Sequence, residues 1–199
     1  MSLKTNYTLL APLYDLAVGR PLRRIREASL ARLPRQGGLR VLVNGIGTGL
    51  DLPLLPPTHH YIGLDLTRAM LRRALPRRGQ LALELVQGDS QRLPFRNDSF
   101  DIVLLHLILA IVPDSVLALR ETGRVLKPGG RVLVLDKFLR PGQRAPLRRA
   151  LSPFAARVAT RLDVVFEEAL AAVAELKLVS DQPVLAHGWL RSIELLKTT

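Results

Sequence analysis

The feature that most constrains the fold of this chain is a short apolar run at residues 41–43, followed after Asn44 by glycines at positions 45, 47 and 49. A continuous apolar run is typical of a strand that is buried on both faces in a parallel sheet. Glycine has no Cβ, so it permits a sharp turn and lets a ligand approach the main chain. The stretch therefore predicts a buried parallel strand that leads into a ligand-binding loop.

A second apolar run ends in a carboxylate. Residues 61–64 lead into Asp65, and nucleotide-binding α/β folds place an acid after a strand at about this spacing to bind ribose hydroxyls. A glycine turn followed by an unrelated surface aspartate is the alternative at this point. The two runs together favour a nucleotide site.

Composition supports one globular domain over residues 1–199. The chain is 48% hydrophobic and 23% charged, which suits an ample core rather than a disordered or fibrous chain. It contains no apolar span long enough to cross a bilayer and no secretory signal. We therefore expect a cytoplasmic protein.

The supply of metal ligands in the sequence is small. The chain has no cysteine, which excludes disulfides, thiolate nucleophiles and thiolate metal sites, and it has 4 histidines. His59 and His60 are adjacent and would point in different directions on most backbones. We therefore expect no metal site.

The formal net charge is +12 at pH 7, and the excess is nearly all arginine. Such a charge favours a polyanionic partner, either nucleic acid or an anionic membrane surface. A compositional bias that scatters arginine among leucine and alanine would give the same total without a binding surface. Both interpretations stay open.

Residues 1–36 precede the first strand and predict a helical segment. Pro21 suits the first turn of a helix, because its missing N–H would be unpaired there anyway. The stripe that would face the sheet contains Leu22, Ile25, Ser29 and Leu33, and Arg23, Arg24, Arg26 and Arg32 lie beside or opposite it. A basic lid or membrane-contacting helix is one interpretation; an ordinary amphipathic helix packed on the sheet is the one that the pattern favours.

Further strands and helices alternate along the rest of the chain. The pattern predicts strands at 81–87, 100–105 and 131–138, and helices at 50–55, from Thr67 to 75 and from Asp114 to 126. In the last third, Ser152 and Asp163 would open two helices, the second ending at Leu176, before a hairpin of 178–185 and 189–196. This alternation specifies an α/β fold, a parallel sheet with helices on both faces. Asp89 and His106 follow strands, so both are candidates for a site at the carboxyl edge.

The chain resembles the class I S-adenosylmethionine-dependent methyltransferases over nearly its whole length. Residues 41–49 resemble the glycine loop of that family, 63–65 its ribose-binding strand end and 88–90 its adenine-binding turn. Residues 93–95, 98–101 and 124–130 resemble the segments that flank its fourth strand and precede its fifth. Residues 47–54, together with Tyr14 and Asp15, are most similar to bacterial phosphatidylethanolamine N-methyltransferases and the related ubiquinone-biosynthesis C-methyltransferases, the methyltransferase type 11 group.

This resemblance implies a Rossmann-like sheet of seven strands in the order 3-2-1-4-5-7-6, with the seventh strand antiparallel. Residues 39–138 would form the cofactor-binding core, and 139–199 the C-terminal helices and closing hairpin. Asp65 would bind the ribose hydroxyls, Leu66 would pack on the adenine, and Asp89 would accept from the adenine amino group. The implied S-adenosylmethionine site consists of Gly45, Gly47, Thr48, Gly49, Asp65, Leu66, Met70, Asp89, Ser90, Leu105 and His106.

One position departs from the family pattern. The family usually has Asp or Glu two residues before the first glycine, where the acid helps to organise the methionine end of the cofactor; this chain has Val43 there. Asn44 or Asp51 would compensate, or water and backbone groups would hold the ammonium. A non-catalytic protein that only binds S-adenosylmethionine is a further alternative.

A sulfonium methyl group is already activated, so the protein has mainly to hold an acceptor in line with the S–CH₃ bond and exclude water. We expect His106 to shape the acceptor pocket as a base and Tyr14 to close over the cofactor. The expected acceptor is a small molecule or a lipid, with the amine of phosphatidylethanolamine as one candidate and peripheral contact with an anionic inner membrane surface. RNA is an alternative acceptor, although no RNA-binding module or aromatic–basic interleaving accompanies it.

Overall fold

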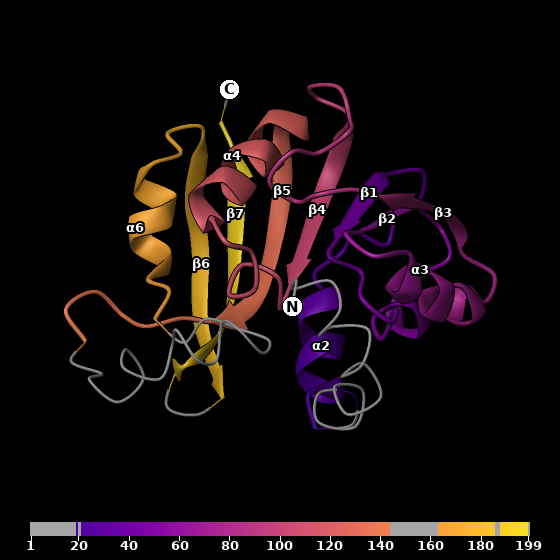
Figure 1. The fold of residues 1–199 in the computed structure, drawn as a ribbon, viewed down its shortest axis with the longest axis horizontal. Coiled ribbons are helices and arrows are strands. Elements are labelled where there is room, and N and C mark those ends of the chain that lie inside the picture. Colours follow the sequence, from indigo (N-terminus) through magenta and orange to yellow (C-terminus); the bar gives the residue numbers. More distant parts are fainter. Residues whose placement is uncertain (1–18, 20, 144–162, 186–187, 199) are drawn as a thin grey trace.

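The computed structural model describes residues 19, 21–143, 163–185 and 188–198. Seven strands form one sheet in the order β3-β2-β1-β4-β5-β7-β6 (Figure 1). The strands are β1 (Arg40–Asn44), β2 (His60–Asp65), β3 (Ala82–Gln87), β4 (Phe100–His106), β5 (Leu126–Lys137), β6 (Leu176–Leu185) and β7 (Leu190–Lys197). The predicted sheet and its strand order are confirmed.

The direction of each strand decides where a ligand can bind. β1 is parallel to β2 and β4, β2 is parallel to β3, and β4 is parallel to β5. β7 is antiparallel to both β5 and β6, as predicted. Because the first five strands are parallel, their carboxyl ends meet at one edge, and the loops that follow β1, β2 and β4 lie together there.

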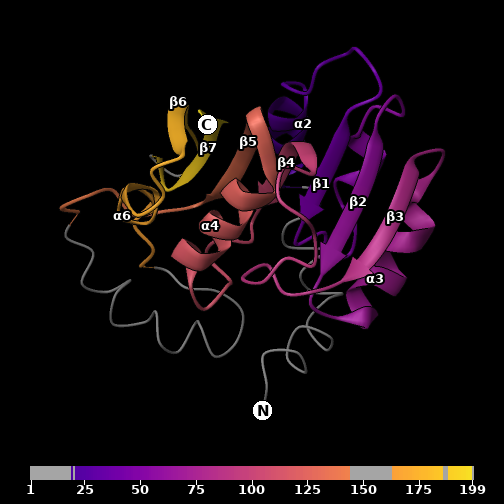
Figure 2. The ribbon, with the colours of Figure 1, turned by 90° about the horizontal axis from the view of Figure 1, so that it is seen from above.

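Helices cover both faces of the sheet, and Figure 2 shows α4 and α6 on the side opposite α2. The helices are α2 (Arg23–Leu30), α3 (Arg68–Ala74), α4 (Ser115–Val125) and α6 (Phe166–Ala171), with 3₁₀ turns η1 (Leu52–Leu54) and η2 (Leu75–Arg78). One apolar core lies between the sheet and α4 and α6. A second lies between the sheet and α2, η1 and α3. No helix in these ranges is long and apolar enough to cross a bilayer.

Two of the predicted helix starts are capped by the expected side chains. The Thr67 Oγ1 accepts from the Met70 N–H at 3.3 Å at the start of α3. The Asp114 carboxylate accepts from the N–H groups of Val116 and Leu117 at 2.9 and 3.0 Å at the start of α4. These caps satisfy N–H groups that the first helical turn leaves unpaired.

Several predicted boundaries differ from the structure. The helix at 50–55 is only the three-residue turn η1, because Pro53 lies within it and the prolines at 56 and 57 follow. Residues 126–130 belong to β5, in which Leu126 pairs with Phe100 and an irregular ladder resumes at Arg131. α6 ends at Ala171, and Leu176 begins β6. The helix predicted from Ser152 lies outside the described ranges.

The arginines of α2 do not all face solvent as the sequence suggested. Arg26 is buried, and its side chain turns inward. Arg32, just beyond the helix, donates to the Glu194 carboxylate of β7 at 2.5 Å. Arg23 pairs with Glu27 at 2.8 Å on the outer surface. Since two of these cations bind within the protein, α2 is a packed helix rather than a freely basic one.

Candidate active site

A cavity of about 180 Å³ opens at the carboxyl edge of the sheet, where the loops after β1, β2, β3 and β4 meet. Its lining consists of Gly45, Gly47, Thr48, Asp65, Leu66, Thr67, Met70, Asp89, Ser90, Gln91, His106, Leu107, Ile108, Ile111, Val112 and Pro113. The walls are mostly apolar, with a few polar groups that converge from different strands. Such a cavity is the usual form of a small-molecule site.

Asp65 lies at the end of β2 and is held in a fixed position. Its Oδ2 accepts from the Gly47 N–H at 3.0 Å, and its Oδ1 accepts from the Thr67 N–H at 2.9 Å. Burial raises the pKa of this carboxyl, and the hydrogen bonds from Thr67 and Gly47 partly offset that rise. The contacts join the glycine loop to the second strand end, so both contribute to one wall.

Gly45 and Gly47 adopt backbone angles that other residues rarely tolerate, with φ of +76° and +56°. A Cβ on Gly45 would lie 2.7 Å from the side chain of Ile108. Glycine is therefore required at position 45, where the loop turns against the segment that follows β4.

Polar groups cluster on the side of the cavity formed after β3. The Ser90 Oγ donates to the Asn44 Oδ1 at 2.6 Å, and the Asp89 Oδ1 accepts from the Gln91 N–H at 2.9 Å. The Asn44 Nδ2 is buried without a hydrogen-bond partner among the described residues. Asn44 does not line the cavity, whereas Asp89 and Ser90 do, so these two side chains are the polar groups that this wall offers to a ligand.

The remaining wall is an apolar segment at 107–113 that the sequence did not indicate as part of a site. The Leu107 N–H donates to the Leu135 carbonyl at 2.7 Å, and the Ala110 N–H donates to the Asp136 Oδ2 at 3.0 Å. Burial raises the pKa of Asp136, while the neighbouring Lys137 charge and backbone N–H groups oppose the rise. No polar motif marks the segment at 107–113, so its position directly after β4 was the only feature of the sequence that could have indicated a role in the site.

His106 ends β4 and uses both ring nitrogens. Its Nδ1 lies 2.9 Å from the Asp51 Oδ2, and its Nε2 lies 3.1 Å from the Ser29 Oγ of α2. With Asp51 ionised, Nδ1 donates and Nε2 accepts from the serine hydroxyl. Ser29 is buried and does not line the cavity. The three groups therefore link α2 to the sheet edge and are not arranged to use the serine as a nucleophile on a bound molecule.

A second cavity of about 50 Å³ lies beside the first, and Gly45, Gly47 and His106 line both. Arg26 and Asp51 complete its lining from α2 and from the glycine loop, with the Arg26 Nη1 3.2 Å from the Asp51 Oδ1. Burial raises the pKa of Asp51, but the His106 and Arg26 side chains outweigh it and hold the pKa below its usual value. An oppositely charged pair therefore lines the smaller cavity, next to His106.

Most of the residues predicted for the site lie together. Nine of them line the larger cavity: Gly45, Gly47, Thr48, Asp65, Leu66, Met70, Asp89, Ser90 and His106. Leu105 is instead fully buried in the core that faces α4, since its side chain points away from the edge. Gly49 faces Leu52 and Ala74, not the cavity. Tyr14 lies outside the described residues.

A family model described as a methyltransferase domain matches residues 42–134. The chain is 31% identical over 181 residues to a phosphatidylethanolamine N-methyltransferase of Cereibacter sphaeroides, covering 88% of each chain. This chain belongs to the class I S-adenosylmethionine-dependent methyltransferases.

Other relatives of this methyltransferase carry related names. It is 35% identical over 137 residues to the ubiquinone/menaquinone biosynthesis C-methyltransferase UbiE of Syntrophotalea carbinolica, covering 64% of this chain and 57% of that protein. Among solved structures, an S-adenosylmethionine-dependent methyltransferase from Mesorhizobium loti matches with a TM-score of 0.67 at 21% identity, over 85% of this chain and 96% of that one. The [4+2]-cyclase SpnF matches with a TM-score of 0.80 at 18% identity, over 99% and 95%. At these identities the two structures show the shared fold alone.

The cofactor of this methyltransferase is S-adenosylmethionine, and the larger cavity fits it. Asp65 offers carboxylate oxygens to ribose hydroxyls, and Gly45 and Gly47 leave the loop beside it without side chains, so a ligand can approach the main chain there. When bound, the cofactor supplies a sulfonium methyl group that is already activated for transfer. The protein then has to orient the acceptor and exclude water.

Proposed function

We propose that this methyltransferase transfers a methyl group to the amine of an aminophospholipid head group, with phosphatidylethanolamine as the first substrate to test. In this proposal the protein works in the cytoplasm, at the inner membrane surface. The observation that carries it is the apolar wall at 107–113, which begins directly after His106 and lines the cavity. The named activity of the Cereibacter sphaeroides relative, which matches over 88% of both chains, supports the same acceptor.

An apolar wall suits a lipid amine for two reasons. Ile108, Ile111 and Val112 would contact the apolar part of the molecule near its head group. An amine attacks only when it is neutral, and a water-poor apolar surface favours the neutral form over the ammonium. The wall would therefore both accept the lipid and lower the pKa of its amine.

The polar end of the reaction would lie near His106. A methyl acceptor has to approach to roughly 3–3.5 Å in line with the bond that breaks. His106 could take the amine proton at Nε2 only after the acceptor displaces the Ser29 hydroxyl, which lies 3.1 Å from that atom. The role of His106 as a base, and that of Tyr14 as a closing residue, stay part of this proposal.

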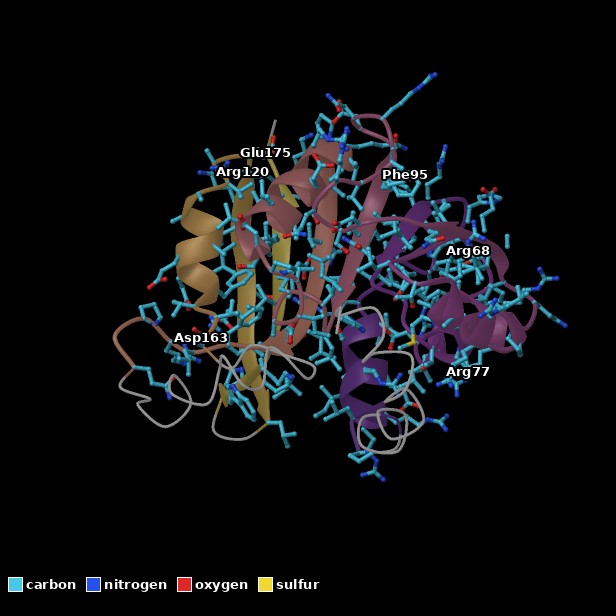
Figure 3. All side chains as sticks on the ribbon, in the orientation of Figure 1. Arg68, Arg77, Phe95, Arg120, Asp163 and Glu175 are labelled. Carbon is cyan, nitrogen blue, oxygen red and sulfur yellow. The ribbon has the colours of Figure 1, made fainter. Side chains whose placement is uncertain are left out.

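The helix α3, which contributes Met70 to the cavity, and the following turn η2 also carry a basic surface that would bring the protein to anionic lipid. α3 and η2 carry exposed Arg72, Arg73 and Arg78 around the exposed Leu75, while Met70 of the same helix lines the cavity. Figure 3 shows Arg68 and Arg77 on this side of the molecule, at the start of α3 and in η2. We call Arg72, Arg73, Leu75 and Arg78 the α3 surface. Basic residues near an anionic bilayer each contribute about 1 kcal/mol to binding.

The test is methyl transfer from cofactor labelled on the methyl group to vesicles of phosphatidylethanolamine and phosphatidylglycerol. We expect label in the lipid extract, in a species that migrates as N-methylated lipid. Asp65→Ala should abolish this label, and Asp101→Ala, which removes a carboxylate paired with Lys127 away from the cavity, should retain it.

A quinone acceptor is the second candidate, because the UbiE relative is named for C-methylation in ubiquinone and menaquinone biosynthesis. Vesicles that contain a demethylmenaquinol in place of phosphatidylethanolamine distinguish the two. Label in the quinone alone, in RNA added to the mixture, or in no component would contradict the aminophospholipid proposal. The last result would instead support a protein that binds the cofactor without transferring its methyl group.

A further inference from the structure

We infer that Arg26 and Asp51 form the receptor for the amino-acid end of the cofactor, in a chain that has Val43 where the family resemblance implies an acid. This end of S-adenosylmethionine is a zwitterion, with a carboxylate and an ammonium on one carbon. In the inference, Arg26 binds the carboxylate and Asp51 binds the ammonium. It concerns the cofactor alone and does not depend on which acceptor is methylated.

Val43 cannot perform this role. Its side chain is 3% exposed and packs among the apolar residues between β1, α2 and η1. Val43 lies on the face of the sheet that α2 and η1 cover. Arg26 belongs to α2, and Asp51 directly precedes η1. Arg26 and Asp51 therefore lie on the same face of the sheet as Val43.

The smaller cavity places the two charged groups next to the methyl-donor end. Gly45, Gly47 and His106 line both cavities, so the two spaces adjoin. Asp65 and Asp89 lie in the larger one, which fixes the ribose and adenine there. A cofactor that runs along the glycine loop from Asp65 would bring its amino-acid end to the smaller cavity.

Arg26 has an unused donor at this place. Its Nη1 donates to Asp51 at 3.2 Å and its Nη2 donates to the Gly19 carbonyl at 2.8 Å. The residue is only 4% exposed, and its buried Nε has no hydrogen-bond partner within the described part of the chain. A buried guanidinium N–H without an acceptor is unfavourable, and a ligand carboxylate would satisfy it.

Asp51 has room for another donor. Each of its oxygens accepts one hydrogen bond, from Arg26 at 3.2 Å and from His106 at 2.9 Å. A carboxylate offers about four acceptor positions, so an ammonium can bind without displacing either partner. The ionised carboxylate and the guanidinium together match the two charges of the zwitterion.

The experiment compares ligands that differ only at this end, by calorimetric titration. S-adenosylhomocysteine carries the amino-acid group, and 5′-methylthioadenosine lacks it while keeping adenine and ribose. We expect wild-type protein to bind the first far more tightly. Asp51→Asn and Arg26→Gln should weaken S-adenosylhomocysteine by about 10- to 100-fold and leave 5′-methylthioadenosine unchanged.

Retained binding of 5′-methylthioadenosine also shows that each variant is folded. Decarboxylated S-adenosylmethionine then separates the two roles, since Arg26→Gln should not weaken it and Asp51→Asn should. Asp51→Glu, which keeps the charge, should recover part of the lost affinity. Asp101→Asn is the matched control, and it should bind every ligand as wild type does.

Several outcomes would overturn the inference. Wild-type protein that binds S-adenosylhomocysteine and 5′-methylthioadenosine equally well has no receptor for the amino-acid end. Equal loss of both ligands in Asp51→Asn and Arg26→Gln would mean that the pair only supports the fold of the loop. Unchanged affinity in both variants would place the amino-acid end elsewhere.

Discussion

Asp65 connects three parts of the site, because it accepts from Gly47 and Thr67 while its carboxylate faces the cavity. Its removal should therefore weaken cofactor binding and also destabilise the glycine loop, because the Gly47 and Thr67 N–H groups lose their acceptor. Hydrogen bonds to a charged group contribute about 1.5–3 kcal/mol each. Asp65→Ala should weaken S-adenosylhomocysteine by at least about 10-fold in calorimetry, and 5′-methylthioadenosine by a similar factor, since both carry the ribose. Loss of the first ligand alone would contradict the ribose assignment.

Asp51 should make stability depend on pH in a defined direction. Burial raises its pKa, but His106 and Arg26 more than offset this and hold it below the ordinary value of 3.8. A depressed carboxyl pKa contributes stability above its unfolded value, and this contribution is lost as pH falls through the folded pKa. The stabilisation by Asp51 should thus be complete near neutral pH and decline below pH 3.8.

The measurement is urea unfolding of wild type and Asp51→Asn between pH 7 and pH 3. Removing one partner of a buried pair costs about 3 kcal/mol or more, so the variant should be less stable at neutral pH. The difference between the two proteins should shrink at the acid end. The other carboxylates are the same in both proteins, so their contributions to the free energy of unfolding cancel in this difference. A difference that stays constant as pH falls below 3.8 would contradict the lowered pKa of Asp51.

At the scale of elements, Gly49 controls how closely the glycine loop packs on α3. It has a φ of +78°, and a Cβ would lie 2.9 Å from Leu52 and 3.0 Å from Ala74. Gly49→Ala should combine backbone strain with overpacking and destabilise the protein by about 2–4 kcal/mol in chemical denaturation. Gly79→Ala is the control, because Gly79 has a φ of +53° with open space around it. An equal loss in both variants would mean that packing on α3 contributes nothing.

Local patterns were sufficient to predict the parallel sheet, the glycine loop and the caps at Thr67 and Asp114, since each depends on neighbours in the sequence. The inward turn of Arg26 could not be predicted in this way. Helical periodicity placed this arginine away from the apolar stripe, and its partner Asp51 is 25 residues away. The wall at 107–113 was missed for a related reason: its residues are apolar and acquire a function only where β4 ends. Leu105 was assigned to the cavity, but strand alternation turns it into the core.

At the scale of the whole molecule, the net charge of +12 can act through one surface or through its total. Variants of the α3 surface distinguish a local effect of charge from an effect of the total charge. Arg72→Ala with Arg73→Ala, and Arg96→Ala with Arg120→Ala, both lower the net charge by 2, but only the first pair lies on the helix that lines the cavity. Binding to vesicles rich in phosphatidylglycerol at low salt should fall by about 30-fold in the first variant and little in the second. Equal effects would mean that the charge acts only as a total.

The most direct test of the account is a crystal structure of the protein with S-adenosylhomocysteine bound. We predict ribose hydroxyls on the Asp65 carboxylate, adenine beside Leu66 and Asp89, and the amino-acid end between Arg26 and Asp51. Density for the ligand outside the cavity at the carboxyl edge, or in it with the adenine and amino-acid ends exchanged, would contradict the account.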